Sequence, residues 1–134
     1  MYILDTDACI YLLNRRYPDA ERRLRRIGPG DPATTTITVA ELRFGALNSA
    51  RPEGNLVRAE IFFAPLLHLS FDDDAATHFA LIRHDLKSPG GPIGITDLLI
   101  ASIARAADGI LVTNNVRKLG RVPGLKVENW FDSR

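Results

Sequence analysis

The stretch YILDTD, residues 2–7, decides the fold class because it joins a short apolar strand to two carboxylates. Tyr2–Leu4 are predicted to form a buried strand, and a helix is predicted from about Ala8. Asp5 then lies at the tip of the strand, where an unpaired buried charge costs several kcal/mol unless a cation relieves it. We therefore expect Asp5 to have a functional role.

The remainder of the chain continues this alternation of strands and helices, without internal repeats, low-complexity segments or a linker. Turn-forming Pro and Gly clusters separate the elements, as in residues 28–32 and 88–94. Such alternation predicts one α/β domain, residues 1–134, with a mainly parallel central sheet flanked by helices. The expected strands are 2–4, 34–38, 67–69, 110–113 and 125–127, and the expected helices are about 8–13, 19–27, 38–48, 56–63, 72–86 and 97–107.

Three further acidic residues stand at predicted helix beginnings: Asp7, Glu41 and Asp97. In an open parallel sheet with right-handed crossovers, these positions and Asp5 meet at the carboxyl edge of the strands. Carboxylate oxygens favour a hard cation such as Mg2+ or Mn2+, and Cys9 is the only cysteine, so no zinc site competes. The pattern predicts a magnesium-type site for phosphodiester chemistry.

Each acid taken alone also has a purely structural interpretation. Glu41 stands three residues after Thr38, the spacing of a helix capping box. Asp7 and Asp97 would occupy first helical turns, where the helix dipole stabilises a carboxylate by up to about 1 kcal/mol. Convergence of the acids in space distinguishes the two interpretations.

Arginines crowd into residues 15–26, although the formal net charge of the whole chain is only +1, from 17 basic and 16 acidic residues. Overall composition therefore does not indicate a nucleic-acid-binding protein. On a helix these arginines would spread over one exposed side, which serves either as a solvated face or as a sequence-independent contact for backbone phosphates. The candidates for contact with a nucleic-acid backbone are Arg15, Arg16, Arg22 and Arg23.

The apolar start of the chain is predicted to be a strand and not an export signal, because Asp5 and Asp7 interrupt it and no small-residue cleavage site follows. The longest apolar stretches, such as residues 61–67, are too short to span a membrane. Together with the single cysteine, this predicts a protein of the reducing cytoplasm.

Four stretches, YILDTD, ITVAELRFGA, GGPIGITDLLIASIA and GILVTNNVRKLGRVPGLKVENW, resemble the PIN-domain ribonuclease toxins of the VapC type in order and spacing. The resemblance covers essentially the whole chain. It implies a PIN-like three-layer fold and an endoribonuclease, dependent on Mg2+ or Mn2+, that cleaves RNA phosphodiester bonds. It also implies a homodimer and neutralisation by a cognate antitoxin protein.

By match to the motifs of this family, Asp5, Glu41 and Asp97 are the catalytic acids, with Asp5 and Asp97 as metal ligands. Asp7 falls where the family usually has Asn, which implies a supporting ligand or a hydrogen-bonding role. Three further residues are candidates for support, through amide oxygens, substrate contact or helix capping: Thr113, Asn114 and Asn115.

One position departs from the family pattern. Where the family commonly has TNN, two residues, Glu and an aromatic residue, this chain has Lys118 and Leu119. An ammonium group cannot ligate a cation and repels one, which argues against a second metal site of the usual kind. The departure motivates an alternative: a catalytically impaired PIN-fold protein acting mainly as an antitoxin-binding or operator-binding partner.

A second alternative is a phosphatase with an Asp-x-Asp start, since Asp5 and Asp7 have that spacing. The apolar run LLIA directly after Asp97 disfavours it, because that chemistry needs a downstream acidic pair and a separate lysine.

Overall fold

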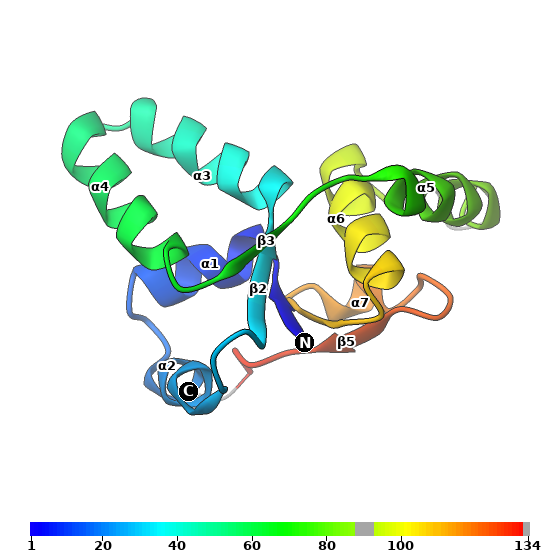
Figure 1. Cartoon of the computed structure of the whole chain (residues 1–134), viewed down its shortest axis with the longest axis horizontal. Helices are drawn as coiled ribbons and strands as arrows, with labels where there is room; N and C mark the ends of the chain where they lie inside the picture. The colour runs from blue at the N-terminus through cyan, green and yellow to red at the C-terminus, as the bar shows by residue number, and fades with distance from the viewer. Residues whose placement is uncertain (88–92, 133–134) are drawn as a thin grey trace.

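The computed structural model describes residues 1–87 and 93–132 (Figure 1). Its five strands are all parallel and form one sheet in the order β3-β2-β1-β4-β5. The predicted α/β fold with a mainly parallel central sheet is confirmed. The strands are β1 (Tyr2–Leu4), β2 (Pro32–Thr35), β3 (Leu67–Leu69), β4 (Ile110–Val112) and β5 (Lys126–Glu128).

The helices cover both faces of this sheet. Figure 1 shows α3 and α4 on one side of the strands and α5 and α6 on the other. Within the described part of the chain, no helix is long and apolar enough to cross a membrane. The helices are α1 (Thr6–Leu13), α2 (Pro18–Arg26), α3 (Thr36–Leu47), α4 (Pro52–Phe63), α5 (Asp73–Asp85), α6 (Ile95–Ala106) and α7 (Val116–Leu119).

The central strand β1 divides the hydrophobic core into two clusters. Leu4 packs with residues of α1 to α4, whereas its neighbour Ile3 packs with residues of α5 to α7. Successive side chains of a strand point to opposite faces, so a strand of three residues serves both cores. The result is a three-layer arrangement with β1 buried in the middle layer.

The boundary between β2 and α3 differs from the prediction. The strand ends at Thr35 and the helix begins at Thr36, two residues before the expected start at Thr38. Thr35 caps the helix, because its hydroxyl accepts a hydrogen bond of 3.1 Å from the backbone N–H of Thr38. The predicted capping box of Thr38 and Glu41 is therefore wrong. The run of β-branched residues concealed the transition, since such residues suit a strand and are tolerated in a first helical turn.

Other helix boundaries differ from the predicted ones by a few residues, for similar local reasons. Helix α1 begins at Thr6 because Asp5 caps it, and α4 begins at Pro52, a residue favoured in the first helical turn. Asp72 caps α5 by accepting a hydrogen bond of 2.9 Å from Ala75 N. Most of the predicted loop 88–94 lies outside the described residues; its last two residues, Ile93 and Gly94, are seen, and Gly94 is the N-cap residue of α6.

The cap at Thr35 generates a prediction about stability. Thr35→Ala should lower the free energy of unfolding by about 1–2 kcal/mol, because a buried capping hydroxyl is lost. Thr36→Ala, one residue later and exposed, is the matched control and should change it little. Denaturant unfolding of the three proteins measures the difference, and equal midpoints for both variants would contradict the assignment of the cap.

Candidate active site

Asp5 is fixed at the carboxyl end of the central strand. Its backbone N–H continues the sheet by donating to Val112 O at 3.1 Å. Its carboxylate caps α1 by accepting a hydrogen bond of 2.9 Å from Ala8 N. Only 5% of the residue is exposed. The sequence places a charge at the strand tip, and the helix that follows holds that charge in one orientation.

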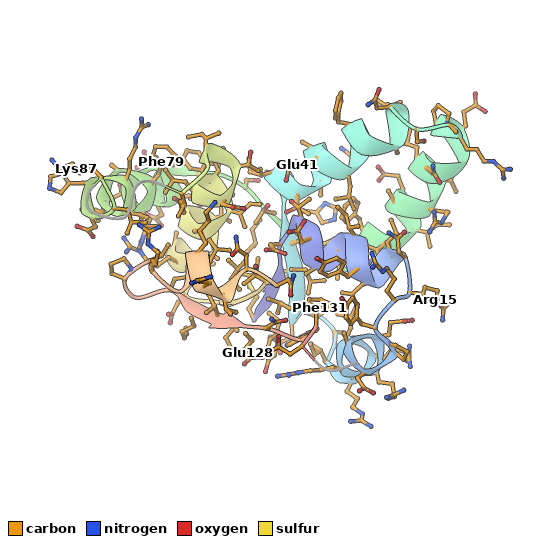
Figure 2. All side chains as sticks on the ribbon, turned by 180° about the vertical axis from the view of Figure 1, so that it is seen from behind. Arg15, Glu41, Phe79, Lys87, Glu128 and Phe131 are labelled. Carbon is orange, nitrogen blue, oxygen red and sulfur yellow. The ribbon has the colours of Figure 1, made fainter. Side chains whose placement is uncertain are left out.

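Glu41 approaches Asp5 from the neighbouring helix α3. The hydroxyl of Thr6, the first residue of α1, donates a hydrogen bond to Glu41 Oε1 and lies 3.2 Å from the hydroxyl of Thr38. Figure 2 places Glu41 near the beginning of α3, above the centre of the sheet. Sequence reasoning missed Thr6; the available signal was a hydroxyl at the first position of the helix between two acidic residues.

Asp97 completes the group from the first turn of α6. A cavity of about 220 Å3 is lined by all four predicted acids together with Thr6 and the start of α6. The structure therefore brings together residues separated by more than half of the chain. The lining residues are Asp5, Thr6, Asp7, Glu41, Gly94, Ile95, Thr96 and Asp97.

The charges of three of the four carboxylates, Asp5, Asp7 and Asp97, act on one another in the cavity. Burial raises the pKa of Asp5 to about 6, hydrogen bonds from Thr113 and Ala8 oppose that rise, and the charges of Asp7 and Asp97 add to it. Burial also raises the pKa of Asp97; the positive charge of Lys118 lowers it and Asp7 raises it. The neighbouring acids therefore make ionisation of Asp5 and of Asp97 less favourable.

The side chains that line the cavity offer carboxylate oxygens and no His or Cys, and oxygen ligands fit a hard divalent cation. Across residues 1–87 and 93–132, no three Asp, Glu, His or Cys side chains are gathered closely enough to hold a metal ion as they stand.

The supporting residues after β4 differ in their relation to the cavity. Thr113 is buried, bonds to Asp5 and also accepts a hydrogen bond of 2.9 Å from Asn115 N. Asn115 is the N-cap residue of α7 by position but makes no side-chain capping bond. Asn114 is directed elsewhere, since its amide donates to the Tyr11 hydroxyl at 3.2 Å. Of the three, Thr113 has a direct contact with a candidate catalytic acid.

Lys118, the residue that departs from the family pattern, is not among the residues that line the cavity. It is half-buried in α7, and its charge acts on Asp97. The position is therefore not a remote surface position.

The four arginines predicted to contact RNA are not among the residues that line the acidic cavity. They follow the C-terminal end of α1, whereas Asp5 caps its beginning. Several have local partners: Arg15 pairs with Glu21 at 3.3 Å, Arg22 with Asp19, and Arg23 with Glu128 at 2.6 Å. Arg23 also stacks on Trp130, and Arg16 lies over Tyr11. These contacts indicate a structural use for much of this charge.

The fold and its acidic edge define a class. The family model of the PIN domain matches residues 2–125. Among solved structures, VapBC2 from Rickettsia felis bound to a DNA fragment from its promoter superimposes with a TM-score of 0.90 at 34% identity, covering 96% of this chain and 98% of that chain. VapBC-1 from nontypeable Haemophilus influenzae gives a TM-score of 0.89 at 31% identity, with coverage of 96% and 97%. The chain belongs to the PIN-domain family.

Curated relatives match over nearly their full length. The tRNA(fMet)-specific endonuclease VapC of Shigella flexneri is 38% identical over 129 residues, covering 96% of this chain and 97% of the relative. Ribonuclease VapC2 of Haemophilus influenzae is 40% identical with the same coverage. Within the PIN-domain family the chain is of the VapC type, the ribonuclease toxin of a toxin–antitoxin pair.

The raised pKa of Asp5 predicts an unusual pH dependence for the metal-free protein. The folded state binds a proton at Asp5 more tightly than the unfolded state, whose carboxyl has the ordinary value of 3.8, so stability falls as pH rises from 3.8 through about 6. Asp5→Asn removes this penalty while keeping a good N-cap residue. Above about pH 7 the variant should be more stable than the wild type by about 2–3 kcal/mol.

Unfolding in EDTA across this pH range provides the measurement. The advantage of Asp5→Asn should shrink as pH falls from 6 and vanish below 3.8. An advantage that does not change with pH would show that the burial of the Asp5 charge is not its cause.

Proposed function

We propose that the acidic cavity binds a divalent cation, Mg2+ or Mn2+, and that an RNA phosphodiester bond is hydrolysed there. Asp5, Glu41 and Asp97 are the proposed catalytic acids, and Asp5 and Asp97 the proposed metal ligands. One observation carries the proposal: a carboxylate that is 5% exposed shares a cavity with three other carboxylates from separate elements. Burying such a charge is costly, and a bound cation relieves the cost.

Different residues orient the different acids of this site. Asp5 is held by Ala8 N and by Thr113, so one oriented carboxylate faces the cavity. Thr6 of α1 restrains Glu41 of α3 by donating a hydrogen bond to its carboxylate. Asp7 is exposed at the mouth of the cavity and supports the local negative potential. When bound, the cation would lower the pKa of a water molecule and neutralise charge on the phosphate.

The substrate class is proposed from the relatives. Two of them, from Shigella flexneri and Salmonella typhimurium, are described as tRNA(fMet)-specific endonucleases and are 38% and 36% identical to this chain. We infer that a tRNA of this kind is cleaved, at an unpaired stretch where the backbone can enter the cavity.

Replacing Asp97 tests the assignment of the acids. Asp97→Asn removes one negative charge and a strong cation ligand, so cleavage of initiator tRNA should fall by at least about two orders of magnitude while the thermal midpoint stays close to that of the wild type. Asp85→Asn, an exposed acid at the end of α5, is the matched control and should cleave normally. EDTA should abolish cleavage by the wild type, and Mg2+ or Mn2+ should restore it.

Full activity of Asp97→Asn would remove this residue from the site. Undiminished cleavage in EDTA would refute the metal requirement. A wild-type protein that binds its antitoxin yet cleaves no RNA under any metal condition would favour the catalytically impaired alternative.

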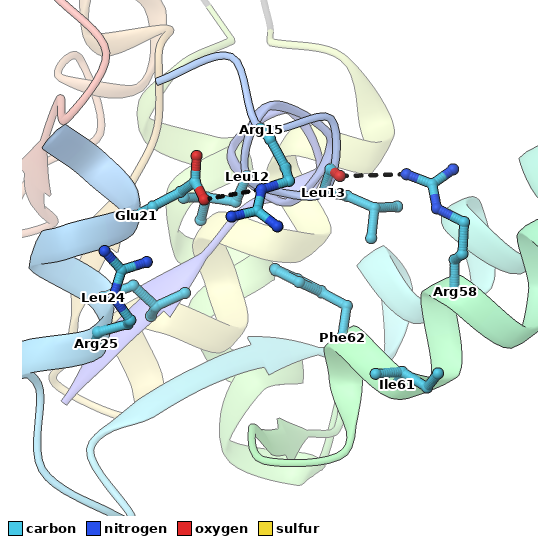
Figure 3. A pocket seen from close by; sticks show the side chains of 9 residues that line it. All are labelled: Leu12, Leu13, Arg15, Glu21, Leu24, Arg25, Arg58, Ile61 and Phe62. Atoms are coloured by element: carbon cyan, nitrogen blue, oxygen red, sulfur yellow. Dashed lines mark hydrogen bonds and ion pairs between the residues drawn. The ribbon is translucent and has the colours of Figure 1, made fainter. Parts of the chain in front are cut away.

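A second concave surface suits the antitoxin. Helices α1, α2 and α4 enclose a groove of about 380 Å3 (Figure 3). Its apolar lining includes Leu12, Leu24 and Phe62, and Arg25 and Arg58 belong to its border. An apolar groove bordered by arginines is complementary to an amphipathic segment with acidic flanks. A related solved structure, VapBC-5 from Mycobacterium tuberculosis, is described as a member of the VapBC family of toxin–antitoxin systems, which supports an antitoxin as the occupant.

The segment 56–67 divides its side chains between core and groove. Phe63 and Leu66 are buried, whereas Ile61 and Phe62 line the groove. For the homodimer we propose a separate contact on α5 and α6, where Leu81 and Ile95 are exposed apolar residues.

A charge placed in the groove should separate antitoxin binding from catalysis and from dimerisation. Ile61→Glu should weaken binding of the cognate antitoxin by at least about tenfold, because a carboxylate replaces an apolar contact. Phe44→Glu on α3 is the matched control, since Ile61 is 69% and Phe44 68% exposed but only Ile61 lines the groove. Calorimetry measures binding, and light scattering should report a dimer for the free wild type and both variants. Equal loss of binding in both variants, or a monomeric wild type, would contradict these assignments.

A further inference from the structure

A second pocket adjoins the acidic cavity and shares two of its walls. This pocket lies between α1, α3 and α4, and we call it the α1–α3–α4 pocket. Its volume is about 300 Å3, and sites for small organic groups hold roughly 300–1,000 Å3. Thr6 and Glu41 line both the pocket and the cavity. If the acids bind the scissile phosphate, a neighbouring nucleotide of the RNA therefore lies at the mouth of this pocket.

The lining of the α1–α3–α4 pocket combines apolar side chains with amide groups. Leu42, Ala46 and Ala59 are buried apolar residues of α3 and α4, and Asn14 and Asn55 carry the amides. The side-chain amide of Asn14 has no hydrogen-bond partner within residues 1–87 and 93–132. An unpaired nucleobase needs this combination, because its ring faces favour apolar contact and its edges form hydrogen bonds.

Arg58 adds a positive charge at the border between this pocket and the apolar groove. Its guanidinium donates hydrogen bonds to two neutral acceptors, Leu13 O at 3.2 Å and Asn55 Oδ1 at 3.3 Å; Figure 3 shows the first of these. Arg43 on the facing helix is paired with Glu60 at 2.7 Å, whereas Arg58 has no carboxylate partner in the described part of the chain. A guanidinium without a carboxylate partner attracts a backbone phosphate.

A glycine in the wall of α3 keeps the pocket open. Gly45 lies inside the helix, where glycine is unfavourable relative to alanine. A Cβ atom added there would meet no atom within 4 Å, and Gly45 does not have a positive φ. Neither close packing nor the backbone therefore requires glycine at this position. A larger side chain would extend into the open space of the pocket and leave the core in place.

We propose that the α1–α3–α4 pocket is a subsite for one nucleobase of the RNA, from a nucleotide that flanks the scissile phosphate. The inference rests on the proposed function of the acidic cavity and adds a recognition site to it. An antitoxin segment is the alternative occupant, since Leu13 and Arg58 also line the apolar groove. The walls shared with the cavity, Thr6 and Glu41, favour RNA, because a base in the pocket then belongs to a nucleotide beside the reacting bond.

Filling the pocket tests this assignment. Gly45→Leu should lower kcat/KM for cleavage of initiator tRNA by at least about fivefold, because the base loses its binding site. Binding of Mn2+, titrated without RNA, should stay as in the wild type. Gly54→Leu is the matched control: Gly54 is also an exposed helical glycine with no atom within 4 Å of an added Cβ, but it does not line the pocket. This control should change neither property.

Substrates that lack one base identify the occupant. Initiator tRNA is prepared without the base of either nucleotide that flanks the cleaved bond, one nucleotide at a time. For one of the two substrates the wild type should lose about as much kcat/KM as Gly45→Leu loses on intact tRNA. Gly45→Leu should lose less than about twofold more on that substrate, because both changes remove the same interaction.

Three results would overturn the inference. The first is cleavage by Gly45→Leu at the rate of the wild type. The second is an additive loss on both abasic substrates, which would place the defect at Glu41, one helical turn from Gly45. The third is weaker antitoxin binding by Gly45→Leu in calorimetry with normal cleavage, which would assign the pocket to the antitoxin. Each leaves the proposed function standing if Asp97→Asn is inactive. A wild type that cleaves no RNA would overturn both.

Discussion

The structure depends on the burial of one carboxylate at the end of its central strand. Asp5 is 5% exposed and bonded to Ala8 N and Thr113, and its pKa is raised to about 6 mainly by that burial. Such a group opposes folding near neutral pH when no cation is bound. The free energy of binding of the proposed cation would partly offset this cost, so metal binding and stability would be coupled.

The fold brings the partners of Asp5 to the same edge by separate routes. Glu41 arrives on α3, which begins at the end of β2, and Asp97 arrives on α6, which leads into β4. The parallel pairing of β1 with both β2 and β4 aligns these elements at the carboxyl end of the sheet. Side chains from outside the acidic set then adjust the site: Thr6 restrains Glu41, and Lys118 offsets part of the charge on Asp97.

Much of this arrangement was accessible from the sequence, because the strand YIL followed by Asp5 has one simple interpretation and the convergence of the acids follows from parallel topology. The start of α3 could not be predicted from the sequence, since the threonines from Thr34 to Thr38 suit both a strand and a first helical turn. The bond from Thr6 to Glu41 joins helices far apart in sequence and needs coordinates. The cluster of arginines in residues 15–26 is evident in the sequence. Only the fold shows that several of them form ion pairs and that they follow the end of α1, whereas Asp5 caps its beginning.

The central claim is that Asp5 and Asp97 hold one cation in the cavity they share with Glu41. Anomalous diffraction from crystals grown with Mn2+ tests it most directly. The account predicts one strong peak in this cavity, with carboxylate oxygens of Asp5 and Asp97 at about 2.1 Å from the ion or joined to it through one bound water. A peak at another location, or crystals saturated with Mn2+ that show none between these carboxylates, would contradict it.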